Sequence, residues 1–135
     1  MRLTSFTDFG LRALMRLAGE PNRIFSTDEI ARQFGISRNH LTKIIQALAN
    51  GGIVRTRRGK TGGFELARPA DQITIGEIVR LLESDQPLVE CFRSDGGSCV
   101  LTPACKLKRR LAAAREAFLR ELDQTALSQC AYVPN

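Results

Sequence analysis

Three of the four cysteines fall in one short stretch, and they are the residues of this sequence best suited to chemistry. Cys91, Cys99 and Cys105 lie in C-F-R-S-D-G-G-S-C-V-L-T-P-A-C, and Cys130 stands apart near the end of the chain. Cytosolic thiols stay reduced, so such cysteines more often serve as metal ligands, redox groups or core residues than as disulfide partners. We therefore expect a thiol-based site at residues 91–105, and we interpret Cys130 as a structural thiol.

The spacing of these cysteines favours an iron–sulfur cluster over zinc. Seven residues separate Cys91 from Cys99 and five separate Cys99 from Cys105. Structural zinc sites commonly use paired cysteines about two to four residues apart, whereas clusters are larger and prefer thiolate ligands. Three cysteines leave one iron to be held by another kind of residue. Buried or redox-active cysteines are the alternative to a metal or cluster site.

The cysteine stretch is predicted to be a loop between two helices. T-I-G-E at residues 74–77 is a capping-box pattern, and it is followed by apolar residues at helical spacing. A loop of roughly twenty residues without its own structure usually carries function. Thr102 and Pro103 then suit the N-cap and first position of a long helix that runs to about Asp123.

The long helix carries an apolar stripe that needs a cover. The stripe consists of Leu107, Leu111, Ala114, Phe118 and Leu122. The same helix of a second subunit would cover it. The alternative is that it packs against the DNA-binding domain of its own chain, residues 1–83, which we call the head. A two-fold dimer would place two reading heads about 34–36 Å apart on a palindromic operator.

The first half of the chain is strongly basic. Residues 1–70 contain twelve Lys/Arg and five Asp/Glu, a net charge of +7, whereas residues 71–135 contain eight and nine, a net charge of −1. Such a half favours a polyanionic partner, because phosphate contacts release counterions from DNA. The position of this charge along the motifs favours DNA over a merely solvated surface.

Capping residues and glycines predict three helices in the basic half. They run from Thr7 to just before Gly19, from Ser26, with Glu29 in a capping box, to Gly35, and from Ser37 to Gly51. Two short helices joined by a tight turn, the second with a polar face, are typical of a major-groove reader. The expected DNA contacts of this third helix are Ser37, Arg38, Asn39, His40, Thr42, Lys43 and Gln46. For His40, a contact to DNA or solvation is favoured over metal binding, because no second ligand lies at i+4.

A basic hairpin follows the third helix. Strands at about Ile53–Thr56 and Gly63–Leu66 flank a loop with Arg57, Arg58 and Lys60, which predicts a wing that contacts DNA. A nucleotide-binding loop is disfavoured, because R-R-G-K-T-G-G lacks the first glycine of that motif and precedes a strand.

Together these elements predict a mainly α fold with a small β-hairpin wing. Residues 1–83 form the winged helix-turn-helix DNA-binding domain, 84–105 the cysteine-rich cluster-binding loop, and 103–135 the dimerisation helix and tail. No stretch approaches the ~18 apolar residues that span a bilayer, so we expect a cytoplasmic protein without a membrane partner.

Four separated segments resemble the NsrR-type nitric-oxide-sensing repressors, which are related to the regulators IscR and RirA. The matching segments are M-R-L-T-S-F-T-D-F-G-L-R-A-L-M-R-L-A, S-R-N-H-L-T-K-I-I, R-R-G-K-T-G-G and L-T-P-A-C-K-L-K. The resemblance implies a homodimeric winged-helix repressor with a [4Fe–4S] cluster. Such a repressor binds operators of nitric-oxide detoxification genes and leaves them when nitric oxide destroys the cluster.

The resemblance also implies the ligands of the cluster. They would be Cys91, Cys99 and Cys105, with Asp8 reaching across from the partner subunit and Arg12 beside it. From the residues alone, Asp8 is a first-turn carboxylate favoured by the helix dipole. Lys108 stands where IscR-like relatives have histidine, which argues against the alternative [2Fe–2S] cluster.

One departure concerns the first two cysteines, which are usually about five residues apart in this group, whereas seven residues separate them here. Two functional alternatives stay open. The first is a regulator of the same fold that senses iron or cluster supply. The second is a cysteine-based redox or metal enzyme, which lacks both a plausible base and a Cys-x-x-Cys pair, so we expect no enzyme.

Overall fold

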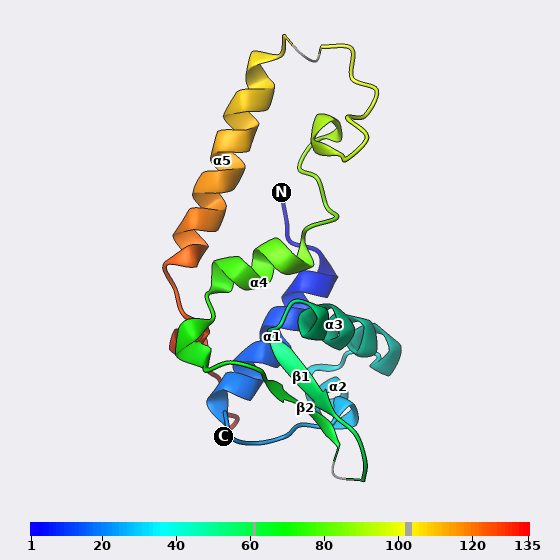
Figure 1. Cartoon of the computed structure of the whole chain (residues 1–135), viewed down its shortest axis with the longest axis vertical. Coiled ribbons are helices and arrows are strands. Elements are labelled where there is room, and N and C mark those ends of the chain that lie inside the picture. The colour runs from blue at the N-terminus through cyan, green and yellow to red at the C-terminus, as the bar shows by residue number, and fades with distance from the viewer. Residues whose placement is uncertain (61, 102–103) are drawn as a thin grey trace.

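The computed structural model describes residues 1–60, 62–101 and 104–135, and it confirms the mainly α fold with a β-hairpin wing (Figure 1). The main elements are α1 (Ser5–Gly19), α2 (Thr27–Phe34), α3 (Arg38–Asn50), β1 (Val54–Arg57), β2 (Gly63–Leu66), α4 (Ile75–Leu82) and α5 (Lys106–Asp123). Three short 3-10 turns are η1 (Ala70–Gln72), η2 (Glu90–Phe92) and η3 (Leu127–Cys130). Within these ranges, no helix combines the length and the apolar composition needed to cross a membrane.

The head is a helical core closed on one side by the wing. Leu14 of α1 and Leu41 and Ile44 of α3 are fully buried between the helices. β1 and β2 pair antiparallel, with Val54 opposite Leu66. Strand β1 begins and ends one residue later than predicted. Phe25 extends this hairpin, because its backbone exchanges hydrogen bonds of 2.9 and 2.8 Å with Phe64. The hairpin therefore rests on the core of the helix-turn-helix.

Helix α1 begins two residues earlier than predicted, and it includes Gly19. The reason is Thr4, whose hydroxyl caps the helix by accepting a hydrogen bond from the Thr7 N–H at 3.3 Å. Thr4 is itself held by Glu83 at the C-cap of α4, at 2.9 Å from its N–H and 2.8 Å from its hydroxyl.

The predicted capping residues of α2 and α4 are correct, but the reciprocal half of each capping box is not formed. Ser26 accepts from the Glu29 N–H at 3.1 Å, and Thr74 accepts from the Glu77 N–H at 3.0 Å. The carboxylate of Glu29 binds Arg23 instead of returning to its cap, and that of Glu77 binds Arg68. An ion pair with a nearby guanidinium takes precedence over the backbone N–H at both helix starts.

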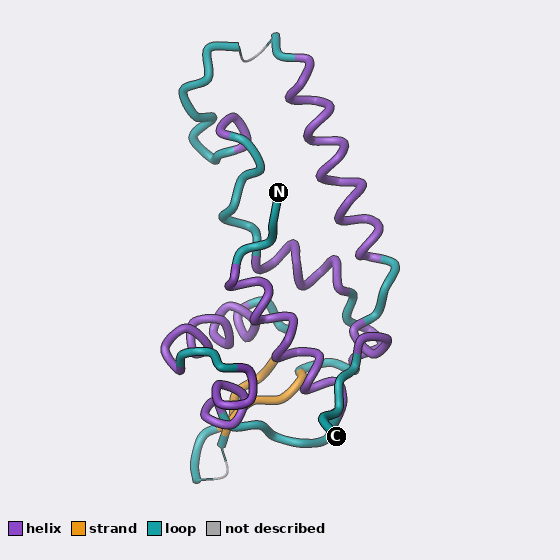
Figure 2. Tube along the Cα trace, turned by 180° about the vertical axis from the view of Figure 1, so that it is seen from behind, coloured by secondary structure: helices purple, strands orange, loops and turns teal. Residues whose placement is uncertain are grey.

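Helix α5 begins at Lys106 with Cys105 as its N-cap, later than the predicted start at Thr102 and Pro103, which lie outside the described residues. It rises away from the head, and only its last turns approach α4 (Figures 1 and 2). There Leu119 is buried.

After α5 the chain returns to the head. Leu127 has no exposed surface, and its N–H donates to the Ile73 carbonyl at 2.7 Å. Further on, the Tyr132 N–H donates to the Met15 carbonyl of α1 at 2.9 Å. The head core is thus completed by residues that follow the long helix.

Candidate DNA-binding surface and cysteine segment

Helix α3 presents a polar face opposite its buried side. Ser37 caps the helix by accepting from the His40 N–H at 3.1 Å, which fixes where the face begins. The exposed side chains of the predicted contact set are Ser37, Arg38, Asn39, Thr42, Lys43 and Gln46. The helix therefore offers hydrogen-bond donors and acceptors of the kind that read base edges.

A groove of about 460 Å³ connects this face to the wing. Its lining comes from the start of α2, from α3 and from the hairpin: Ser26, Thr27, Asp28, Arg38, Thr42, Ile45, Gln46, Thr56, Arg57, Gly62 and Gly63. Arg38 is oriented within it, because its Nη1 lies 3.2 Å from the Asp28 carboxylate. The reading helix and the wing thus belong to one continuous surface.

His40 differs from the other residues of the predicted contact set. Its ring lies 6.0 Å from the ring of Phe6 and 5.5 Å edge-on from that of Phe9, and its side chain is half-buried. His40 therefore joins the start of α3 to the first turns of α1. A contact between His40 and DNA stays a prediction.

The wing contains a carboxylate that the sequence analysis did not single out. Glu65 is only 8% exposed, and one of its oxygens accepts from Arg55 Nε at 2.6 Å and from Arg57 Nη2 at 2.7 Å. Arg57, followed by Arg55, lowers the pKa of Glu65, so it stays ionised at neutral pH. Alternation along the paired strands places these three residues on one face, which was a usable signal once the register was known.

Arg58 and Lys60, at the tip of the wing, are both exposed. In contrast to Arg57, neither forms an ion pair within the part of the chain that the structure describes. Their positive charge is therefore available to a phosphate backbone without first leaving a carboxylate.

The three clustered cysteines lie on the segment that joins α4 to α5. Cys91 is in η2, Cys99 is in the following loop, and Cys105 is the N-cap of α5; each is a half-buried free thiol. Uncommitted thiols are the donors that iron–sulfur clusters use, so the donor set suits such a group. Among the described residues, no three His, Cys, Asp or Glu side chains gather closely enough to hold a metal ion. A single chain thus supplies the donors without assembling them.

Asp8 and Arg12 form a paired patch on the outer side of α1. Arg12 binds the Asp8 carboxylate with two hydrogen bonds, of 3.0 Å from Nε and 2.9 Å from Nη2. The two side chains are 49% and 47% exposed, respectively. The carboxylate is thus oriented by its neighbour and remains reachable from outside the subunit.

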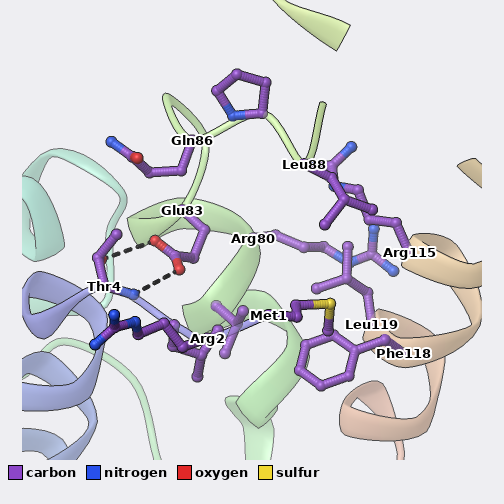
Figure 3. A pocket seen from close by; sticks show the side chains of 13 residues that line it. Met1, Arg2, Thr4, Arg80, Glu83, Gln86, Leu88, Arg115, Phe118 and Leu119 are labelled. Carbon is purple, nitrogen blue, oxygen red and sulfur yellow. Dashed lines mark hydrogen bonds between the residues drawn. The ribbon is translucent and has the colours of Figure 1, made fainter. Parts of the chain in front are cut away.

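Hydrogen bonds join α4 to the start of α1 and to α5, and Figure 3 shows those between Glu83 and Thr4. Glu83 holds Thr4, and Arg80 binds Glu116 at 2.9 Å and Asp123 at 2.8 Å. Glu116 and then Asp123 raise the pKa of Arg80 further above its ordinary value. A cavity of 510 Å³ lies beside these bonds, between the N-terminal residues, α4 and α5. Sequence reasoning missed these bonds because their partners lie 36 to 79 residues apart.

The head, the basic groove and the projecting helix together define a winged-helix transcription regulator. The chain belongs to the Rrf2 family, whose model, described as iron-dependent transcriptional regulator, matches residues 3–132. Because this is a family of regulators, the enzyme alternative is set aside.

Solved structures support the same class over the whole chain. CymR of B. subtilis, the global cysteine regulator, is 28% identical, with 99% of each chain covered and a TM-score of 0.75. The oxidised form of Staphylococcus aureus CymR is also 28% identical, with both chains covered fully and a TM-score of 0.71. IscR of T. potens is 25% identical over 95% of this chain and 84% of its own, with a TM-score of 0.72.

Proposed function

We propose that this regulator is a homodimeric repressor that binds palindromic operator DNA. It would sense nitric oxide through a [4Fe–4S] cluster. The observation that carries the proposal is the position of the three free thiols. They lie on the segment that leaves the head at α4 and enters α5 at Cys105. The resemblance of four sequence segments to NsrR-type repressors supports nitric oxide as the effector and its detoxification genes as the targets.

On the DNA side, α3 would enter the major groove and the wing would follow the backbone. Asn39 and Gln46 are exposed amides, which suit the edge of adenine, whereas Arg58 and Lys60 suit phosphates. The continuous groove between α3 and the wing supports simultaneous use of both.

For the cluster, Cys91, Cys99 and Cys105 would supply three ligands, and Asp8 of the partner subunit the fourth. The outward-facing carboxylate of Asp8, oriented by Arg12, supports a bond between subunits. The bound cluster would supply the centre that reacts with nitric oxide; a [2Fe–2S] cluster is the alternative.

The residues of the chain itself offer a path from the cysteine segment to α3. Glu83, which directly precedes the segment, binds Thr4, the cap of α1. The next turns of α1 carry Phe6 and Phe9, which contact His40 at the start of α3. A rearrangement at residues 84–105 would therefore change the position of α3 through this chain of contacts.

Asp8→Ala tests the bond between subunits. We expect it to weaken nitric-oxide-dependent release from the operator more than it weakens binding to non-specific DNA, because it removes a ligand and no DNA contact. Asp71→Ala, at an exposed carboxylate in η1, is the control. Titration of both variants with nitric oxide, followed by operator binding, makes the measurement, and unchanged switching in Asp8→Ala contradicts the coupling.

Two other effectors are each favoured by a specific observation. The family description and the likeness to IscR favour a regulator that senses iron or cluster supply. The full-length likeness to CymR, together with thiols that are not gathered into a metal site among the described residues, favours a regulator of cysteine metabolism. All three candidates use the same DNA-binding surface.

One experiment separates these effectors. The protein is purified without oxygen, its iron is measured, and its absorbance is recorded at about 400 nm, where clusters absorb. Operator binding is then followed during titration with nitric oxide, iron chelator or thiol oxidant. Brown protein released by nitric oxide supports the proposal. Iron-free, colourless protein that still binds its operator and ignores nitric oxide overturns it.

A further inference from the structure

The seven residues between Cys91 and Cys99 are folded into a closed turn. One carboxylate oxygen of Glu90 accepts two hydrogen bonds from Ser98, at 2.9 Å from its N–H and 2.7 Å from its hydroxyl. Glu90 directly precedes Cys91, and Ser98 directly precedes Cys99. The chain is therefore tied together at the positions next to the two cysteines.

The interior of the turn has its own hydrogen bonds. The Arg93 N–H donates to the Glu90 carbonyl at 3.0 Å, and the Gly96 N–H donates to the Arg93 carbonyl at 2.9 Å. The carboxylate of Asp95 accepts from the Gly97 N–H, also at 2.9 Å. The extra length between the cysteines is thus taken up inside an ordered turn.

Two adjacent glycines differ in how closely they approach Glu90. Both have left-handed backbone angles, with φ of +77° at Gly96 and +64° at Gly97. A Cβ on Gly97 would lie 2.5 Å from Glu90 Cγ and 2.8 Å from its carbonyl oxygen, whereas a Cβ on Gly96 would meet nothing within 4 Å. The turn therefore closes tightly against Glu90 at Gly97 alone of these two.

We propose that Glu90 is a positioning residue that folds the seven-residue spacing into a turn and so sets Cys91 and Cys99 side by side. The bonds from Ser98 to Glu90 join the two residues that directly precede the cysteines, so they draw the ends of the seven-residue spacing together. As a statement about cluster ligands, this inference rests on the proposed function. As a statement about two neighbouring thiols, it does not.

The test measures how readily the two thiols are bridged in cluster-free, full-length protein. Cys105→Ser and Cys130→Ser leave only Cys91 and Cys99, and dibromobimane becomes fluorescent when both thiols displace its bromides. Because two hydrogen bonds hold the turn, we expect Glu90→Ala to slow bridging by at least about threefold. Glu90→Gln, which keeps an acceptor oxygen, should recover most of the rate. Glu121→Ala is the control, since Glu121 is exposed on α5 and its side chain has no bond among the described residues.

Glycine variants give a second, matched comparison in the same background. Gly96→Ala and Gly97→Ala share the cost of a left-handed backbone, but only Gly97→Ala forces atoms against Glu90. We expect slower bridging in Gly97→Ala than in Gly96→Ala. Equal rates in Glu90→Ala, Gly97→Ala and the unaltered turn overturn the inference. Iron retention by the four-cysteine protein is measured separately, so the cluster proposal can fail while the turn stands, or the reverse.

Discussion

At the scale of single residues, Glu65 offsets and orients the charges of two arginines in the wing. A nearly buried carboxylate holds Arg55 and Arg57 from beneath, so neither guanidinium is simply a free positive charge. In the proposed complex with DNA these arginines would be oriented before binding, which would lower the entropy lost on binding. The two arginines share the neutralisation of Glu65, so the three side chains together carry one net positive charge.

Arg57→Ala should therefore weaken operator binding more than Arg58→Ala, because it removes an oriented guanidinium and leaves the charge of Arg55 largely offset by Glu65. Arg58→Ala should mainly reduce the slope of log affinity against log salt, by roughly 0.9 for one lost phosphate contact. Fluorescence anisotropy of a labelled operator across salt concentrations measures both effects. The double variant Arg57→Ala/Glu65→Gln should bind more tightly than Arg57→Ala, and equal affinity of the two would contradict this role of Glu65.

At the scale of elements, α5 has two sides with different partners. Glu116, Leu119 and Asp123 face α4, where they bind Arg80 or are buried. Helical spacing places Leu107 on the opposite side, where it remains exposed in the single chain, whereas Phe118 borders the cavity beside α4. This division supports the proposal that a second copy of α5 covers the apolar stripe.

Leu107→Glu should accordingly shift the protein from dimer to monomer, because it places a charge in the proposed interface. Leu107 is 62% exposed in the subunit, so the change should leave the fold of the head intact. Sedimentation velocity gives the oligomeric state, and circular dichroism reports the fold. Ala113→Glu, on an exposed face outside the stripe, is the matched control. A dimer that survives Leu107→Glu would exclude this helix face as its interface.

Local signals explain which elements were predicted correctly. Ser26, Ser37 and Thr74 cap their helices as the sequence indicated, because a cap depends on residues only three positions away. The start of α5 was misplaced, since proline permits a helix start without requiring one. The hydrogen bond from Thr4 to Glu83 joins residues 79 positions apart, so no local sequence pattern predicts it.

At the scale of the whole molecule, Arg80 is one of the residues that connect the head to α5. It binds two acidic side chains of α5 from its place on α4, while the cysteine segment leaves from the same end of α4. The angle at which α5 leaves the head is thus set partly by a charged contact, which responds to protonation.

Arg80→Gln should lower Tm near neutral pH and make stability less sensitive to acid. Arg80 lowers the pKa of Glu116 in the folded state, so their contact stabilises the fold above the unfolded pKa. This stabilisation is lost as pH falls through the lower, folded pKa. The difference in Tm between wild type and Arg80→Gln should therefore shrink in acid. Arg109→Gln, at an exposed residue of α5, is the control, and a difference that grows in acid would contradict the assignment.

The burial of Leu127 in the head has a consequence for biosynthesis. While α4 and α5 emerge from the ribosome, the place that Leu127 will occupy beneath η1 and α1 is still empty. Because contacts distant in sequence form late, we expect the nascent head to gain its full stability only after translation has passed α5. The ability to bind a promoter would then arise only once the proposed dimerisation helix has been made. Incomplete, monomeric chains would therefore rarely occupy the promoter.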